Sequence, residues 1–440
     1  MKKLFLFILF LYAFNASLHA NKISYEHAME LQQNEQFEQA IDCYENFLRQ
    51  NPNHVSALFN LGHCYLALGK GQQAIDSLET ITTLYPYALP ALYNAAYTRK
   101  TIGMIDEAIA LYKNIIAFDS SYDQAQLALG FAYLIKGDFE NGWLQHEKYL
   151  KRSGKNGDLL RNLLNSNVAT LHNKLIFLHP EGGLGDSLQF IRYAQRLHDM
   201  GATVVVRAQK PLLSLFSRLD YIDHLIGPEG TIPGYHAEAT LMSLPAIFGD
   251  TESTFPTDIP YLYAQQELID SWKIKLSHDM YYKVGICWQA DKHNDKSRLP
   301  IARRGCPLLE FMPLNIENVS LYSLQKYDGV EELENLPTNF PLTHFYDLDE
   351  NTGAFEDTAA LMRNLDLIIT VDTAIAHLAG ALGCTVWLLL PYATDWRWIH
   401  NRTDSPWYPN MKIFKQETPF DWTSVIQNVR NELISISAST

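Results

Sequence analysis

Small and large side chains recur at a step of 34 residues between residues 21 and 154, which is a repeat length typical of helical hairpins. One column of this repeat holds only small residues, which let two antiparallel helices approach closely: Ala28, Gly62, Ala96 and Gly130. A second column does the same: Ala40, Ala74, Ala108 and Gly142. A third column is filled mostly by large residues: Tyr44, Leu78, Tyr112 and His146. The pattern predicts four stacked hairpins over residues 21–154.

The internal turn of three of these hairpins carries a glycine, at Gly69, Gly103 and Gly137, and the first hairpin has Glu35 there. Period and residue pattern resemble the tetratricopeptide repeat, whose stacked hairpins form a superhelix with a concave face. Such faces commonly hold an extended peptide, so we expect a protein or peptide partner. A structural spacer or a dimerisation arm is the alternative interpretation.

From Lys174 onward, short apolar runs alternate with helical stretches, a texture that predicts parallel strands with helical crossovers. Strands are expected at 175–178, 202–207, 282–288, 320–324, 367–371 and 385–390, and helices at 187–200, 211–219, 357–364 and 374–382. The expected fold class is therefore α + α/β, an α-solenoid followed by two Rossmann-like halves. The expected domains are 21–154, a linker helix in 155–173, and halves at 174–264 and 265–440.

Two turns follow strands at the edge where ligands of such sheets lie. The first, Gly182–Asp186, carries Gly183 and Gly185, which let the backbone approach a ligand closely. A carboxylate repels phosphate, so Asp186 fits a proton acceptor or a partner for a sugar hydroxyl. The alternative for Asp186 is an ordinary helix N-cap.

In the second turn, Asp372 ends a strand and Thr373 begins a helix. Free N–H groups at a helix N-terminus favour an anion such as a pyrophosphate. His377, one turn further on, could donate to the same oxygens. The alternative is a capped helix with a hydrogen-bonded core histidine. A basic segment, residues 292–298, could neutralise a diphosphate or be a solvated loop.

The chain has 35 basic and 49 acidic residues, a net charge of −14, which makes nucleic acid an unfavourable partner. Five cysteines without metal-ligand spacing predict neither a disulfide framework nor a zinc site. Residues 1–20 combine two lysines with a short apolar run, which predicts a signal peptide, with an uncleaved anchor or a misassigned start as alternatives. We therefore expect an exported or membrane-associated protein, or a cytoplasmic one if this leader does not function.

Several blocks between Leu175 and Gln416 together resemble bacterial tetratricopeptide proteins whose second half is a glycosyltransferase domain. The most specific are Asp366–Gly383, Asp395–Trp398 and Ser405–Pro409, with the earlier glycine turn through Phe190. The region is more distantly similar to lipopolysaccharide heptosyltransferases of GT-B fold, and the whole plan to O-linked N-acetylglucosamine transferases.

The resemblance implies a role for each matching residue. Asp186 would be the general base, and the block with Asp372, Thr373 and His377 would bind the donor diphosphate, although Ala374 replaces the family's glycine. His377 would assist the leaving group. The resemblance also implies phosphate ligands after the first C-terminal strand, Lys296 and Arg298, and a nucleotide pocket at Gln325 and Lys326.

The implied reaction is an inverting displacement of a sugar from a nucleotide-sugar donor to an acceptor hydroxyl, with no cofactor and no metal. Asp347 and Asp349 match the short DxD pattern of metal-dependent transferases, but that pattern is common by chance and those enzymes have another fold. The alternative function is a tetratricopeptide scaffold whose second half is catalytically inactive. Nucleotide sugars are cytoplasmic in bacteria, which conflicts with export of this chain.

Overall fold

The computed structural model describes residues 24–152, 157–165, 171–296 and 299–437, so the predicted leader lies outside the described residues. The chain divides into two compact units, and each is described by itself. Unit 1 runs to Ala132 and includes the short segment Leu299–Ala302, and unit 2 holds the rest. No helix among the described residues is both long and apolar enough to cross a membrane.

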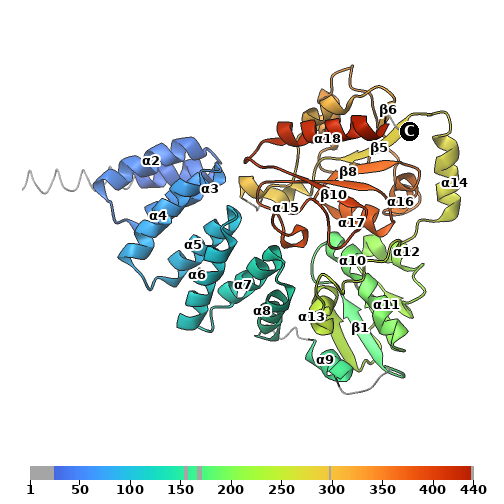
Figure 1. Cartoon of the computed structure of the whole chain (residues 1–440), viewed down its shortest axis with the longest axis horizontal. Coiled ribbons are helices and arrows are strands. Elements are labelled where there is room, and N and C mark those ends of the chain that lie inside the picture. Colours follow the sequence, from blue (N-terminus) through green and yellow to red (C-terminus); the bar gives the residue numbers. More distant parts are fainter. Residues whose placement is uncertain (1–23, 153–156, 166–170, 297–298, 438–440) are drawn as a thin grey trace, which may run out of the picture. The chain divides into compact units, whose positions relative to one another are not determined.

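Unit 1 is a series of antiparallel helical hairpins (Figure 1, blue to cyan). Its helices are residues 24–33, α2 (Phe37–Gln50), α3 (Val55–Ala67), α4 (Gly71–Leu84), α5 (Leu89–Thr101), α6 (Ile105–Phe118) and the first part of α7 (Asp123–Lys136). The small-residue columns are at the helix contacts, since Ala28, Ala40, Ala74, Ala96 and Ala108 are fully buried. The predicted α-solenoid is confirmed.

The internal turns of the hairpins explain the glycine column. Gly69, Gly103 and Gly137 have φ of 72°, 91° and 84°, a left-handed conformation that glycine adopts without steric cost. Glu35 takes the same place in the first hairpin with φ of 59°, where a side chain costs roughly 1–2 kcal/mol. The turn geometry is therefore kept even where the favoured residue is missing.

The last hairpin is divided between the two units, because the boundary between Ala132 and Tyr133 falls inside α7. Its second helix, α8 (Phe139–Arg152), packs within unit 2 against α13 (Leu244–Phe248). A short helix, α9 (Asp158–Asn165), follows and packs against β4 (Ala237–Thr240). The end of the repeat array is thus built into the core of the α/β unit.

Unit 2 contains two parallel sheets. The first has the order β3-β2-β1-β4, with β1 (Leu175–His179), β2 (Thr203–Arg207) and β3 (His224–Ile226) beside β4. The second has the order β10-β9-β8-β5-β6-β7. Its strands are β5 (Tyr282–Cys287), β6 (Val319–Ser323), β7 (Leu342–Thr343), β8 (Leu367–Val371), β9 (Val386–Leu390) and β10 (Met411–Lys415). Five-residue buried runs such as β8 and β9 are typical of strands covered on both faces.

Helices cover these sheets and join the two halves (Figure 1, green to red). The first half has α10 (Leu184–Phe190), α11 (Arg192–Asp199), α12 (Leu213–Phe216) and α13. The second has α14 (Gln266–Lys275), α15 (Lys292–Lys296), α16 (Glu356–Met362), α17 (Ala374–Ala381) and α18 (Trp422–Ser437). Helix α10 of the first half packs against α17 of the second. Their first turns lie close together, because a Cβ added to Gly185 would lie 3.7 Å from Cα of Ala374.

One expected boundary was wrong in a way that matters for the site. The helix predicted at 187–200 begins three residues earlier, at Leu184, and is interrupted at Ile191. Asp186 is therefore inside the first turn of α10, and not at its N-cap, which is Gly183. Gly183 has the extended backbone of an N-cap residue, with φ of −75° and ψ of −177°, and the helix begins at the next residue.

Candidate functional site

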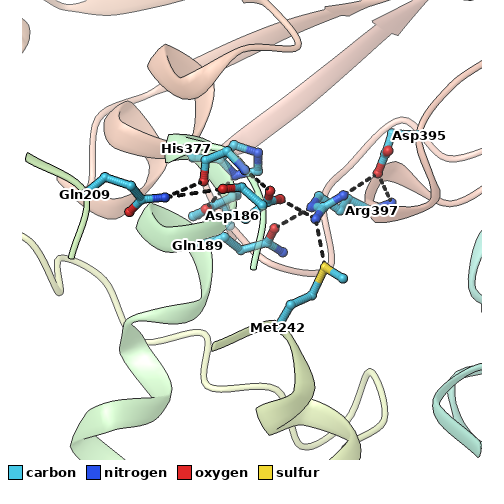
Figure 2. Close-up of polar contacts among 10 residues, drawn as sticks. Asp186, Gln189, Gln209, Met242, His377, Asp395 and Arg397 are labelled. Atoms are coloured by element: carbon cyan, nitrogen blue, oxygen red, sulfur yellow. Dashed lines mark hydrogen bonds and ion pairs between the residues drawn. The ribbon is translucent and has the colours of Figure 1, made fainter. Parts of the chain in front are cut away.

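Asp186 has a carboxylate that is fixed through both of its oxygens (Figure 2). Its Oδ2 accepts a hydrogen bond from the backbone N–H of Gly183 at 2.6 Å, and its Oδ1 accepts one from Nη2 of Arg397 at 2.5 Å. The side chain still keeps 25% of its surface exposed. A carboxylate held in one orientation and open to solvent can accept a proton through its remaining lone pairs.

Arg397 is buried among acceptors from both halves of unit 2 (Figure 2). Its Nη1 donates to Oδ1 of Asp395 at 2.8 Å, and its Nε donates to Oε1 of Gln189 at 2.9 Å. Burial alone would lower the pKa of this guanidinium, but the carboxylates of Asp186 and Asp395 outweigh it and raise the pKa above its ordinary value. Arg397 therefore stays charged and links Asp186 in the first half to Asp395 in the second.

His377 lies one turn inside α17 and is 4% exposed. Its Nδ1 is 3.0 Å from the hydroxyl of Tyr408, and its ring stacks on Trp398 with centroids 5.4 Å apart. Burial, aided by the positive charge of Arg397, lowers the pKa of His377 to about 3. The imidazole is therefore neutral near pH 7 and can offer a ligand one hydrogen bond, but no positive charge.

The glycines of the first turn differ in what they allow. A Cβ added to Gly182 would lie 1.9 Å from Oδ2 of Asp186, and one added to Gly185 would lie 2.8 Å from Cδ2 of His377. At Gly183 the nearest atom would be 3.9 Å away. Gly185 thus permits the approach of α10 to α17, whereas Gly183 contributes the backbone N–H that holds the carboxylate.

The second predicted turn lies at the same edge. Asp372 follows β8 and is 7% exposed. Its negative charge helps to raise the pKa of Arg397, although burial and the charges of Asp186 and Asp395 have larger effects on that pKa. Thr373 is the N-cap of α17, because its Oγ1 accepts from the backbone N–H of Ile375 at 3.3 Å. The predicted strand end and helix start therefore converge with Asp186 and Arg397 on one cluster.

Gln325 and Lys326, the residues expected at the nucleotide pocket, have structural partners. Oε1 of Gln325 accepts from the backbone N–H of Gln289 at 2.9 Å, and its Nε2 donates to the carbonyl oxygens of Gln289 and Asp328 at 3.0 and 2.7 Å. Nζ of Lys326 donates to the carbonyl oxygen of Leu348 at 2.6 Å. Gln325 thereby joins the segments that follow β5 and β6, and a nucleotide contact by either residue stays a prediction.

The basic segment after β5 is a short helix, α15, over most of its length and not the expected loop. Lys292 at its start pairs with Glu331. The side chain of Lys296 and all of Arg298 lie outside the described part of the chain. Phosphate binding by this segment therefore stays a prediction.

Asp349 of the DxD pattern has a structural role. Its Oδ1 accepts from the backbone N–H of Thr358 at 2.9 Å, and its Oδ2 accepts from the hydroxyl of the same residue at 2.6 Å. Burial raises the pKa of Asp349 above its ordinary value, while these hydrogen bonds oppose the shift. The residue stabilises the first turns of α16.

A buried arginine behind the site was missed by the sequence reasoning. Arg192 on α11 donates through Nη1 to the carbonyl oxygens of Pro256 and Trp407 at 2.8 and 2.9 Å, and through Nη2 to the hydroxyl of Tyr261 at 2.7 Å. Its guanidinium also lies over the Tyr408 ring, 4.8 Å from the centroid. Arg192 ties the first half to the second. The hydrophobic pattern of the sequence does not identify Arg192 as buried, because charged residues on helices usually face solvent.

The sequence pattern does not single out Arg397 either, although this residue lies in one of the blocks that carry the family resemblance. The resemblance of Asp395–Trp398 implies no role for a particular residue within it. An arginine flanked by two tryptophans and preceded by an aspartate was the signal that could have identified it. Short charged segments of this kind are common on surfaces, so spacing alone does not select the buried ones.

Comparison with known proteins gives partial matches to both regions. Residues 25–88 match the family model of the tetratricopeptide repeat. Protein FlbA of Caulobacter vibrioides is 27% identical over 297 residues, which cover 61% of this chain and 48% of FlbA. The chain therefore spans about half the length of this curated relative.

Solved structures match each region at low overall similarity. The crystal structure of the MamA protein is 25% identical, with a TM-score of 0.29, over 31% of this chain and 74% of that one. The ADP-heptose lps heptosyltransferase II of E. coli is 14% identical, with a TM-score of 0.40, over 60% of this chain and 98% of that one.

Proposed function

We propose that unit 2 is a glycosyltransferase that moves a sugar from a nucleotide-sugar donor to an acceptor hydroxyl. The observation that carries the proposal is the convergence of a fixed carboxylate, Asp186, with the start of α17 at Thr373. These two features come from different parallel sheets and meet where α10 packs on α17. Group transfer to a hydroxyl needs both a proton acceptor and a site for an anionic leaving group.

In this reaction Asp186 takes the proton of the acceptor hydroxyl as the oxygen attacks the anomeric carbon. The bond between that carbon and the donor diphosphate breaks, and the anomeric configuration inverts. The diphosphate leaves toward the N-terminus of α17, where backbone N–H groups of an eight-residue helix favour negative charge. Neutral His377 contributes a hydrogen bond there, and no metal ion is needed for charge neutralisation.

The repeats of unit 1 would hold the protein that is modified, or a partner that brings the acceptor. Stacked tetratricopeptide hairpins present a continuous surface for an extended chain. This function joins a docking array and a transferase in one polypeptide.

A second candidate function is a scaffold whose α/β unit binds no donor. The observation that favours it is the ion pair itself, since Arg397 occupies one oxygen of the carboxylate that would act as base. Titration of the full chain with UDP, GDP and ADP, followed by thermal shift and calorimetry, separates the two. Saturable binding of one nucleotide supports the transferase, and absence of binding by all three supports the scaffold.

The compartment in which the protein acts follows from the predicted leader. We propose that residues 1–20 direct the chain to the membrane or beyond it, which would limit its access to cytoplasmic nucleotide sugars. Fractionation of cells that express the full chain, with protease added to intact cells or spheroplasts, tests this. Complete protection in the cytoplasmic fraction would contradict export.

A further inference from the structure

We infer that Trp143, on the last helix of the repeat array, is a positioning residue for the Asp186–Arg397 pair. The inference rests on the proposed function, because it assigns Trp143 to the same site. By its sequence α8 belongs to the fourth hairpin, yet it packs as part of unit 2. Three sets of interactions connect it to the site.

The first set joins Trp143 to the neighbour of Arg397. Trp143 is 4% exposed, and its ring meets that of Trp396 edge-on, with centroids 5.4 Å apart and planes at 88°. Its Nε1 donates to the carbonyl oxygen of Asp250 at 3.1 Å, which fixes the orientation of the indole. The guanidinium of Arg397 in turn lies 4.5 Å from the Trp396 ring centroid. A displaced Trp396 would therefore move Arg397.

The second set reaches the helix that carries the carboxylate. Trp396 is nearly parallel to Phe190 of α10, with centroids 6.5 Å apart and planes at 14°. Phe139 of α8 packs edge-on against Phe255 and Trp407, at 4.7 and 6.2 Å. Each aromatic pair contributes about 0.5–1.5 kcal/mol beyond the area that it buries. Both members of the ion pair thus depend on one aromatic cluster, which α8 completes.

The third set connects α8 with the turn before Asp186. His146, one turn after Trp143, is 1% exposed. Burial lowers the pKa of His146, the charge of Glu181 opposes that shift, and the charge of Arg397 adds to it. Glu181 stands just before Gly182 and accepts from the hydroxyl of Thr240 at 2.6 Å. The rings of Trp143 and His146 lie on the same face of α8, with centroids 6.4 Å apart, so this face interacts electrostatically with Glu181 and Arg397 as well as packing on Trp396.

The test compares two tryptophans of similar setting in the full chain. Trp272 on α14 is 5% exposed, donates through Nε1 to Oδ1 of Asp357 at 2.8 Å, and meets Phe345 edge-on at 4.8 Å. Trp143→Leu removes the ring and the donor, Trp143→Phe keeps the edge-on ring, and Trp272→Leu is the matched control. Amide hydrogen exchange needs no substrate, and steady-state hydrolysis of UDP-, GDP- and ADP-sugars measures turnover.

We expect Trp143→Leu to speed exchange in segments 184–190 and 395–398 by about tenfold or more, with no such change in Trp272→Leu. For the donor that is turned over, kcat should fall about tenfold while KM stays within about twofold, and Trp143→Phe should restore most of kcat. Equal exchange in the two leucine variants would overturn the inference. A wild-type chain that hydrolyses no donor would contradict the proposed function instead, and the exchange comparison would still decide the role of Trp143.

Discussion

Nη2 of Arg397 donates to Oδ1 of Asp186 at 2.5 Å, a contact between residues that are 211 positions apart in the sequence. The pair joins the two parallel-sheet halves of unit 2, and its arginine is also held by Asp395 and Gln189. Because Asp186 is the proposed base, the same contact bears on stability and on chemistry.

Removal of the Arg397 charge should destabilise unit 2 because it leaves two carboxylates close together without a cation. We expect Arg397→Gln to lower the free energy of unfolding by about 2–4 kcal/mol in urea titrations. Asp186→Asn added to that variant should recover part of the loss, since one unpaired charge is gone. Arg402→Gln, which removes ion pairs at the surface to Glu252 and Asp404, should cost at most about 1 kcal/mol. Strictly additive effects of Arg397→Gln and Asp186→Asn would contradict the pairing.

The approach of α10 to α17 should tolerate no side chain at Gly185. In Gly185→Ala the new Cβ would lie 2.8 Å from Cδ2 of His377, so we expect a loss of about 1–3 kcal/mol in the free energy of unfolding. Gly183→Ala is the matched control, because its Cβ would have 3.9 Å of clearance from Asp186. Thermal or urea unfolding measures both. Equal stability of the two variants would mean that the helices do not approach as described.

The neutral state of His377 should make stability depend on pH. Its folded-state pKa of about 3 is below the ordinary value of 6.5, so the unfolded chain binds a proton that the folded chain excludes. This contribution is fully present above pH 6.5 and is lost as the pH falls toward 3, by about 1.4 kcal/mol per pH unit. His377→Gln should therefore lose less stability than wild type between pH 7 and pH 5.

Urea unfolding at several pH values checks this prediction, with His27→Gln as a control at a histidine that is 57% exposed. The control should keep the wild-type pH dependence. If His377→Gln also keeps it, the imidazole is not the group that titrates in this window.

Sequence periodicity predicted the architecture well because the repeats and the buried strands are local patterns. The glycine column gave the hairpin turns, and the apolar runs gave the central strands within one or two residues. Glu35 shows a limit of this reasoning, since its φ of 59° follows from the neighbouring helices and not from its own preference. Helix α10 begins at Leu184 and not at the predicted Ser187, and the hydrogen bond from the Gly183 N–H to Asp186 stabilises this earlier start.

The placement of a candidate residue was predictable where it stands at the end of a strand or the start of a helix, as Asp372 does after β8 and Thr373 does before α17. Arg192 and Arg397 could not be found in this way, because each is buried only through contacts with segments far away in the sequence. Their partners include main-chain carbonyl groups and aromatic rings, which leave no pattern in the spacing of residues. These two arginines are buried by packing between the halves of unit 2, and no local sequence pattern predicts that packing.

The most direct test of the central claim is release of nucleoside diphosphate from nucleotide sugars by the full chain, compared with Asp186→Asn. Wild type should turn over one donor among UDP-, GDP- and ADP-sugars. Asp186→Asn should bind the product nucleotide within about threefold of wild type, because the proposed base would contact the acceptor and not the diphosphate. Its turnover should fall by a factor of about 100 or more, which is the usual contribution of a general base. Full turnover by Asp186→Asn would contradict the role of this residue as the base, and no binding and no turnover by wild type would contradict the proposal that unit 2 is a glycosyltransferase.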